Sequence, residues 1–154
     1  MAMFASERTG RAQEALALLI MRWGLAWFLL VWAVNKFLAP GQYVRLWGFI
    51  HGWKIDETTV YYLAGVQVVI CIAIMLGVAR IFSYAAGLAM HLVSTWAVLP
   101  RLLDPFVVRD GFPSNRNLSI TVAALAAFIA LWLLRHRDHW SFDAWWKARR
   151  GDRR

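Results

Sequence analysis

The sequence predicts an all-α integral membrane protein: a bundle of four transmembrane helices with a C-terminal amphipathic segment at the membrane interface. Hydrophobic residues make up 60% of the 154-residue chain and 10 residues are Trp, which is more apolar surface than a soluble domain of this length buries. The apolar residues gather in four blocks of about 20 residues, the length that crosses a bilayer core. Strand-like alternation is absent, and only helices and closed barrels satisfy their backbone in lipid.

The four blocks form a predicted membrane domain over residues 15–134, between a polar N-terminal segment (1–14) and a basic tail (135–154). The expected helices are Ala15–Leu38, Thr58–Ala79, Ile81–Pro100 and Asn117–Leu134. Because Arg80 alone separates the second block from the third, these two helices are expected to be antiparallel neighbours joined by a very tight turn. The other connections are expected as loops on the opposite side, Ala39–Glu57 and Arg101–Arg116.

The distribution of Lys and Arg predicts the orientation. With Arg22 set aside, ten of the 17 basic residues fall on the side that holds both termini and the Arg80 turn, and six fall on the other side. Positive charge concentrates on the cytoplasmic side of membrane proteins, so both termini are expected in the cytoplasm. The net charge of +8 is expected to meet anionic lipid headgroups. No nucleic-acid-binding motif accompanies it, so nucleic acid is not an expected partner.

The basic tail is predicted to lie in the headgroup layer. Trp140, Phe142, Trp145 and Trp146 alternate there with Lys and Arg. A helix of this composition places its rings at the acyl boundary and its cations among the phosphates. The alternative is a frayed tail that its tryptophans anchor.

Polar side chains inside the apolar blocks are the candidate functional residues, because they are costly in lipid. Nearly all of them fall in the outer half of the membrane, which indicates a pocket or partner surface that opens outward. The candidate ligand-binding residues are Lys36, Gln67, His91, Ser94 and Arg116.

These candidates have structural alternatives. Lys36, near a helix end, is long enough to extend to the interface, and so is Arg22 on the inner side. Gln67 is suited to joining two helices by a hydrogen bond. His91 is suited to bonding a backbone group or Ser94. Because Gln67 and His91 lie at similar depths on neighbouring helices, a direct or ligand-bridged contact between them is also possible if their faces converge.

The sequence contains no self-contained catalytic site. Cys71 is the single cysteine, which excludes a CxxC thiol mechanism, and no phosphate-binding loop or nucleophile elbow is present. His91 is the only histidine at membrane depth, which disfavours a bis-histidine haem. His136 and His139, with Asp138 between them, are a weak metal signal. We therefore predict no catalytic residue, no metal ligand and no intrinsic cofactor.

Several short motifs resemble those of DoxX-like membrane proteins. They are Arg22-Trp-Gly-Leu, then Trp32-Ala-Val-Asn-Lys36-Phe-Leu-Ala-Pro40, then Leu76-Gly77 before Arg80, and finally Asn115-Arg116-Asn117 before the last block. The resemblance covers about residues 22–134. Ala33 departs from it, because the family has a glycine before the lysine.

The resemblance implies a multi-pass protein of the bacterial inner (cytoplasmic) membrane. It further implies a membrane subunit of a quinone-reducing enzyme, such as thiosulfate:quinone oxidoreductase, or a partner of oxidative-stress proteins. The chain is then expected to be a non-catalytic subunit or anchor of a redox complex, with the lipid bilayer and other membrane or redox subunits as partners. Its outward polar cluster would hold a quinone headgroup or the base of a partner subunit. The alternatives are a purely structural subunit and a component of a small-solute permease, for which four helices are few.

Overall fold

The computed structural model describes residues 2–109, 112–113 and 115–151. It is helical apart from one two-stranded antiparallel ladder, in which Val108 pairs with Pro113. The elements in chain order are α1 (Ala2–Leu38), α2 (Pro40–His51), α3 (Glu57–Leu76), α4 (Arg80–Ala97), α5 (Leu99–Leu102), β1 (Val108–Arg109), β2 (Phe112–Pro113), the 3₁₀ turn η1 (Arg116–Leu118), α6 (Ser119–Leu133), the 3₁₀ turn η2 (Arg135–Arg137) and α7 (Phe142–Gly151).

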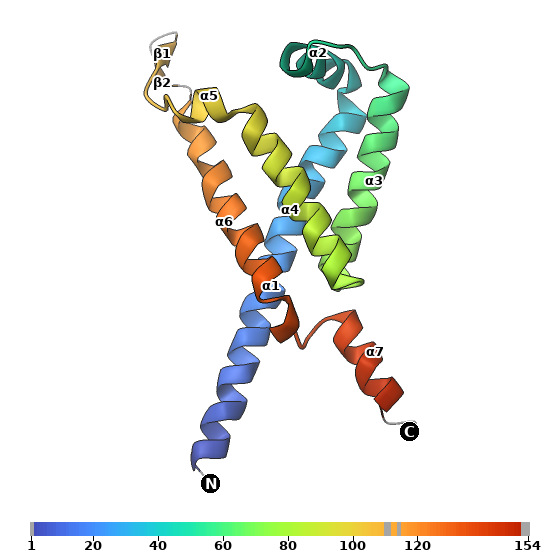
Figure 1. The fold of residues 1–154 in the computed structure, drawn as a ribbon, viewed down its shortest axis with the longest axis vertical. Coiled ribbons are helices and arrows are strands. Elements are labelled where there is room, and N and C mark those ends of the chain that lie inside the picture. The colour runs from blue at the N-terminus through green and yellow to red at the C-terminus, as the bar shows by residue number, and fades with distance from the viewer. Residues whose placement is uncertain (1, 110–111, 114, 152–154) are drawn as a thin grey trace.

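The long helices α1, α3, α4 and α6 run up and down in chain order (Figure 1). α1 packs most extensively against α3, and α4 against α6, while α3 and α4 join the two pairs. The N-terminus, the α3–α4 turn and α7 lie at one end of the bundle, here called the terminal end (Figure 1). The opposite end, with α2, α5 and the β1–β2 ladder, is the loop end. Both termini therefore lie at the same end.

Within the described residues, three helical segments are long and apolar enough to cross a membrane: Thr9–Leu38, Glu57–Leu76 and Arg116–Leu133. The chain is thus a membrane protein by length and composition. α4, the expected third span, is 18 residues long but carries a buried face of small and polar residues, namely Ser83, Tyr84, Gly87, His91 and Thr95. That face lowers its mean hydropathy while its outer face, with Phe82 and Val93, remains apolar and exposed.

The tight turn predicted between the second and third blocks is present, but it occupies residues 77–79 rather than Arg80 alone. Gly77 ends α3 in the left-handed conformation, with φ of 66°, and its N–H bonds to Ala73 O and Ile74 O. Ala79 follows with φ of 47°. A glycine cap of this kind stops the helix three residues earlier than the apolar pattern does.

The remaining boundaries differ from the sequence expectation where local signals override apolar content. α1 already begins at Ala2, because residues 2–14 are mostly good helix formers. The expected loop 39–57 contains α2, which has Pro40 in its first turn and is capped after His51 by Gly52, with φ of 73°. The third block breaks at Val98, ahead of the short α5, and the fourth opens with the turn η1.

An apolar layer packs between the two ends of the bundle. Its buried members come from α1, α3, α4 and α6: Leu18, Leu25, Ala26, Leu29, Cys71, Ile74, Tyr84, Phe128 and Leu131. Gly87 permits the close approach of α4, since a Cβ there would lie 2.7 Å from Ile74 Cδ1 and 3.1 Å from Phe128 Cε1. Polar groups at the two ends are therefore separated by close-packed hydrocarbon.

Candidate functional site

The predicted site residues Lys36 and Gln67 come together at the loop end. Gln67 lies on the face of α3 that is buried against α1. Its Nε2 donates a hydrogen bond of 2.8 Å to the Leu29 carbonyl oxygen. This bond orients the amide so that its Oε1 accepts a hydrogen bond from Lys36 Nζ. Gln67 thus joins α1 to α3, as its structural alternative proposed, and also positions the ammonium group.

The Lys36 ammonium group retains unused hydrogen-bonding capacity. It has three N–H donors, and one of them is used by Gln67. Nζ also lies 5.1 Å from the centre of the Tyr43 ring, which α2 places over it. Among the described residues no carboxylate forms an ion pair with Lys36. A half-buried cation whose hydrogen-bond partner is a neutral amide is poised to accept an electronegative ligand atom.

A groove of about 470 Å³ opens on the exposed side of α1, and Lys36 is not among the residues that line it. Its lining comes from one helix face: Trp27, Leu30, Val31, Trp32, Val34, Asn35 and Leu38. The lining is apolar apart from Asn35, the residue before Lys36. Burial raises the pKa of the nearby Tyr43 phenol, which keeps that hydroxyl protonated. The groove therefore offers hydrocarbon walls with one polar side chain, Asn35, among them.

His91 belongs to a different part of the bundle. Its Nε2 lies 2.9 Å from the Thr121 carbonyl oxygen on α6. Its ring packs between Phe28 and Phe128, with ring centroids 5.3 and 5.4 Å away. The contact with Gln67 that their similar depth allowed is not made, because each side chain bonds to a partner on another helix. His91 instead fastens α4 to α6.

The other two predicted residues lie outside the Lys36–Gln67 pair. Ser94 is exposed, and its hydroxyl donates a hydrogen bond of 3.0 Å to the Met90 carbonyl oxygen of its own helix. Arg116 is exposed in η1, at the start of α6. Of the five predicted residues, the structure therefore brings Lys36 and Gln67 into direct contact.

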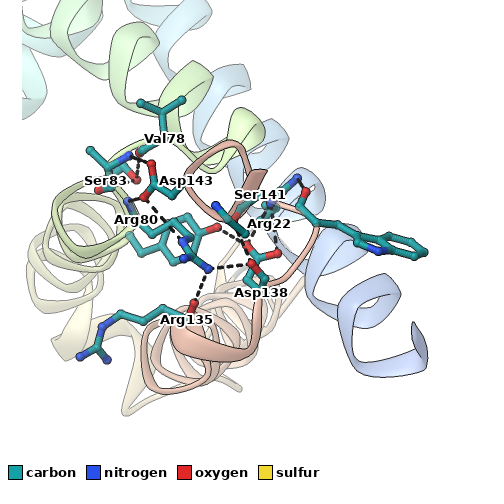
Figure 2. A network of polar contacts seen from close by, with 12 residues as sticks. Arg22, Val78, Arg80, Ser83, Arg135, Asp138, Ser141 and Asp143 are labelled. Atoms are coloured by element: carbon teal, nitrogen blue, oxygen red, sulfur yellow. Dashed lines mark hydrogen bonds and ion pairs between the residues drawn. The ribbon is translucent and has the colours of Figure 1, made fainter. Parts of the chain in front are cut away.

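A polar cluster that sequence reasoning missed closes the terminal end of the bundle (Figure 2). Arg22 is 4% exposed and Asp138 is 0% exposed, and Arg22 Nη1 lies 2.9 Å from Asp138 Oδ2. Tyr84 donates to the same carboxylate oxygen at 2.6 Å. Arg22 Nη2 also donates to the Trp140 carbonyl oxygen at 2.8 Å. Arg22 does not extend to the headgroups, because the tail folds back and supplies its counter-charge.

The same cluster anchors the tail to the α3–α4 turn (Figure 2). Asp143 accepts the backbone N–H groups of Ala79 and Arg80, at 3.0 and 2.9 Å. Arg80 Nη1 donates to the carbonyl oxygens of Arg135 and Asp138, at 2.8 and 2.6 Å. The contacts of Arg22, Tyr84 and Arg80 with residues 135–143 are called the clasp below. The available sequence signal was Arg22 itself, since an arginine inside an apolar block needs a partner.

No family model, curated protein or solved structure matches the chain. The resemblance to DoxX-like membrane proteins therefore rests on its short motifs alone.

Proposed function

We propose that the chain is a non-catalytic membrane subunit of a bacterial redox complex, and that it holds a quinone headgroup at the loop end of α1. The observation that carries this proposal is the Lys36 ammonium group. It bonds to the neutral Gln67 amide, has two further N–H donors, and follows Asn35, which lines an apolar groove on α1.

The chemistry of a quinone fits this arrangement. A quinone carbonyl oxygen accepts hydrogen bonds, and it gains negative charge when the ring is reduced. A nearby cation stabilises that charge, and hydrogen bonds that involve a charged group are worth about 1.5–3 kcal/mol. Lys36 and Asn35 are the donors that we assign to the headgroup. The Trp and Leu walls of the groove suit the ring and its isoprenoid tail, which would enter from the lipid.

The membrane topology in this proposal has four spans. α4 completes the set, because its polar face is turned into the bundle and its apolar face is exposed. Four spans place both termini on one side, and the excess of Lys and Arg there favours the cytoplasm. α7 then lies in the headgroup layer of the inner leaflet. A reporter fused after the last residue should behave as cytoplasmic, and a periplasmic signal would contradict this orientation.

A permease is a weaker interpretation of the same geometry. The polar residues at the loop end and the clasp at the terminal end are separated by the packed layer around Gly87 and Phe128. Transport through the bundle would have to open that layer. The broken helices that transporters use at mid-membrane have no counterpart in α1, α3 or α6, which are continuous helices across the layer.

The test is the quinone content of the subunit isolated in mild detergent from a host that makes quinones. Lys36→Met keeps the length of the side chain but removes its charge. We expect it to lower the quinone bound per subunit about ten-fold or more, with normal membrane accumulation. Lys54→Met is the matched control, because Lys54 is an exposed lysine at the same end, and it should leave the quinone content unchanged.

Two outcomes would contradict the quinone site. One is equal quinone content in the Lys36→Met and Lys54→Met variants. The other is loss of membrane accumulation in Lys36→Met to the same extent as loss of quinone, which would make Lys36 a folding residue. Co-purifying redox subunits would support the proposed complex. Their absence in every detergent tested would count against it.

A further inference from the structure

α7 presents three aromatic rings and two stacked guanidinium groups on its surface. The rings of Phe142, Trp145 and Trp146 lie within 5.4–6.3 Å of one another, centre to centre. Arg149 stacks over Trp145 at 4.2 Å, and Arg150 stacks over Trp146 at 5.2 Å. Both tryptophans remain 45% exposed. The helix therefore pairs an apolar surface with cations that are held directly against it.

The clasp prevents α7 from moving freely. Asp143, in its first turn, bonds the backbone of Ala79 and Arg80, and its own N–H lies 3.3 Å from the Gly77 carbonyl oxygen. Lys147 lies four positions after Asp143, which is about one helical turn. The basic half of α7 is therefore held at a set distance from the terminal end of the membrane helices.

A guanidinium group that lies flat on an indole keeps its N–H edge available. That edge matches two phosphate oxygens, as the planar fork of arginine does in bidentate contacts. Among the described residues no carboxylate forms an ion pair with Arg149 or Arg150. The same kind of stack recurs at the terminal end of α6, where Arg135 lies 4.2 Å over the ring of Trp132. Arginines therefore stack on tryptophans both on α7 and at the terminal end of α6.

We propose that α7 binds the headgroups of anionic phospholipids, with Arg149 and Arg150 donating to phosphate while the rings of Trp145 and Trp146 lie at the acyl boundary. The partner is a lipid rather than an acidic protein, because α7 pairs its cations with exposed aromatic rings and the long helices of the same chain also expose large apolar side chains. This inference rests on the proposed membrane location of the terminal end, and it is independent of the quinone site.

The test uses the full chain purified in a neutral detergent. Phosphatidylglycerol or phosphatidylcholine is added, and bound lipid is counted by native mass spectrometry across a lipid titration. We expect phosphatidylglycerol to bind more tightly than phosphatidylcholine. Each basic residue near a membrane surface is worth about five-fold in affinity for anionic lipid. The double variant Arg149→Gln/Arg150→Gln should therefore weaken phosphatidylglycerol binding by about 25-fold.

The matched control is Arg45→Gln/Arg101→Gln, which removes the same charge at the loop end. Arg101 also lies over an aromatic ring, 5.9 Å from the centre of Phe49, so the control removes a similar stack. We expect the control to change phosphatidylglycerol binding by less than about two-fold. Asp143→Asn keeps every cation but weakens the clasp, and it should lower the preference for phosphatidylglycerol only partly.

Three results would overturn the lipid site. The first is equal binding of the two lipids by the unmodified chain. The second is an equal loss of binding in the α7 variant and the loop-end control, which would show an effect of net charge alone. The third is displacement of bound phosphatidylglycerol by inorganic phosphate at millimolar concentration. Quinone content, measured on the same samples, should not change in the α7 variant, so this proposal and the quinone site can fail separately.

Discussion

Replacing Asp138 with asparagine removes the counter-charge of Arg22 and leaves the buried guanidinium group facing a neutral amide. Arg22 is 4% exposed and Asp138 is fully buried, with 2.9 Å between Nη1 and Oδ2. Removing one partner of such a pair costs about 3–5 kcal/mol, because the remaining charge stays desolvated. The acceptor of the Tyr84 hydroxyl is weakened by the same change.

The measurement is thermal unfolding in a mild detergent, followed by circular dichroism. For a chain of this length 1 kcal/mol corresponds to about 2–4 °C, so Asp138→Asn should lower Tm by about 6 °C or more. Glu14→Gln is the control, because it breaks the ion pair with Arg137, in which the two side chains are 46% and 53% exposed. An exposed pair contributes less than about 1 kcal/mol, and Tm should barely move.

The double variant Arg22→Leu/Asp138→Leu tests whether the uncompensated Arg22 charge causes the loss of stability. Replacing both members of a buried pair with apolar residues is often neutral or stabilising, so the double variant should recover most of the lost Tm. A double variant as unstable as Asp138→Asn would show that the uncompensated charge is not the cause. An Asp138→Asn variant with the same Tm as Glu14→Gln would show that the Arg22–Asp138 pair contributes little to stability.

Three further changes probe other parts of the chain. Gly77→Ala puts a Cβ at φ of 66° and 2.5 Å from Ser141 Cβ, so the tail should detach, and hydrogen exchange over residues 138–143 should rise. Gln67→Leu removes two hydrogen bonds at a buried position, so the free energy of unfolding should fall by about 1–3 kcal/mol. Gln67→Glu keeps the acceptor for Lys36, so its free energy of unfolding should fall less. Hydrogen bonds from the Thr59 side chain and N–H hold the pKa of Asp56 below its ordinary value of 3.8. Because the folded pKa is lowered, its contribution to stability is present above that ordinary value and is lost as the pH falls through the folded pKa. A ¹³C NMR titration measures this shift, and Asp56→Asn should abolish the pH dependence.

Apolar content and helix signals account for the parts of the fold that the sequence predicted. An uninterrupted apolar block in lipid has to satisfy its own backbone, so a helix follows from composition alone. The closeness of the second and third blocks forces an antiparallel turn, which is present at residues 77–79. Helix ends were predicted less well, because glycine and proline set them locally. Gly77 and Pro40 are the two clearest cases.

The sequence by itself determined that the chain is apolar enough for a membrane, that its second and third apolar blocks turn back tightly near Arg80, and that Lys36 carries a charge near the end of an apolar helix. These are properties of composition and spacing. Depth along a helix also follows from counting residues, which put Gln67 and His91 at one level. The rotation of each helix about its axis does not follow from counting, and it depends on how all neighbouring side chains pack. Only the tertiary structure therefore decided that Gln67 meets α1 while His91 meets α6.

The clasp also could not be predicted from the sequence, because its residues are far apart along the chain. Arg22 and Asp138 are 116 positions apart, and the segment that carries Asp138 has no apolar periodicity that would direct it into the bundle. Its position is decided by the electrostatic cost of leaving Arg22 without a counter-charge and by the open N–H groups at the start of α4. The Arg22 guanidinium group and the N–H groups at the start of α4 both need acceptors. They come close to each other only after α1, α3 and α4 have packed together.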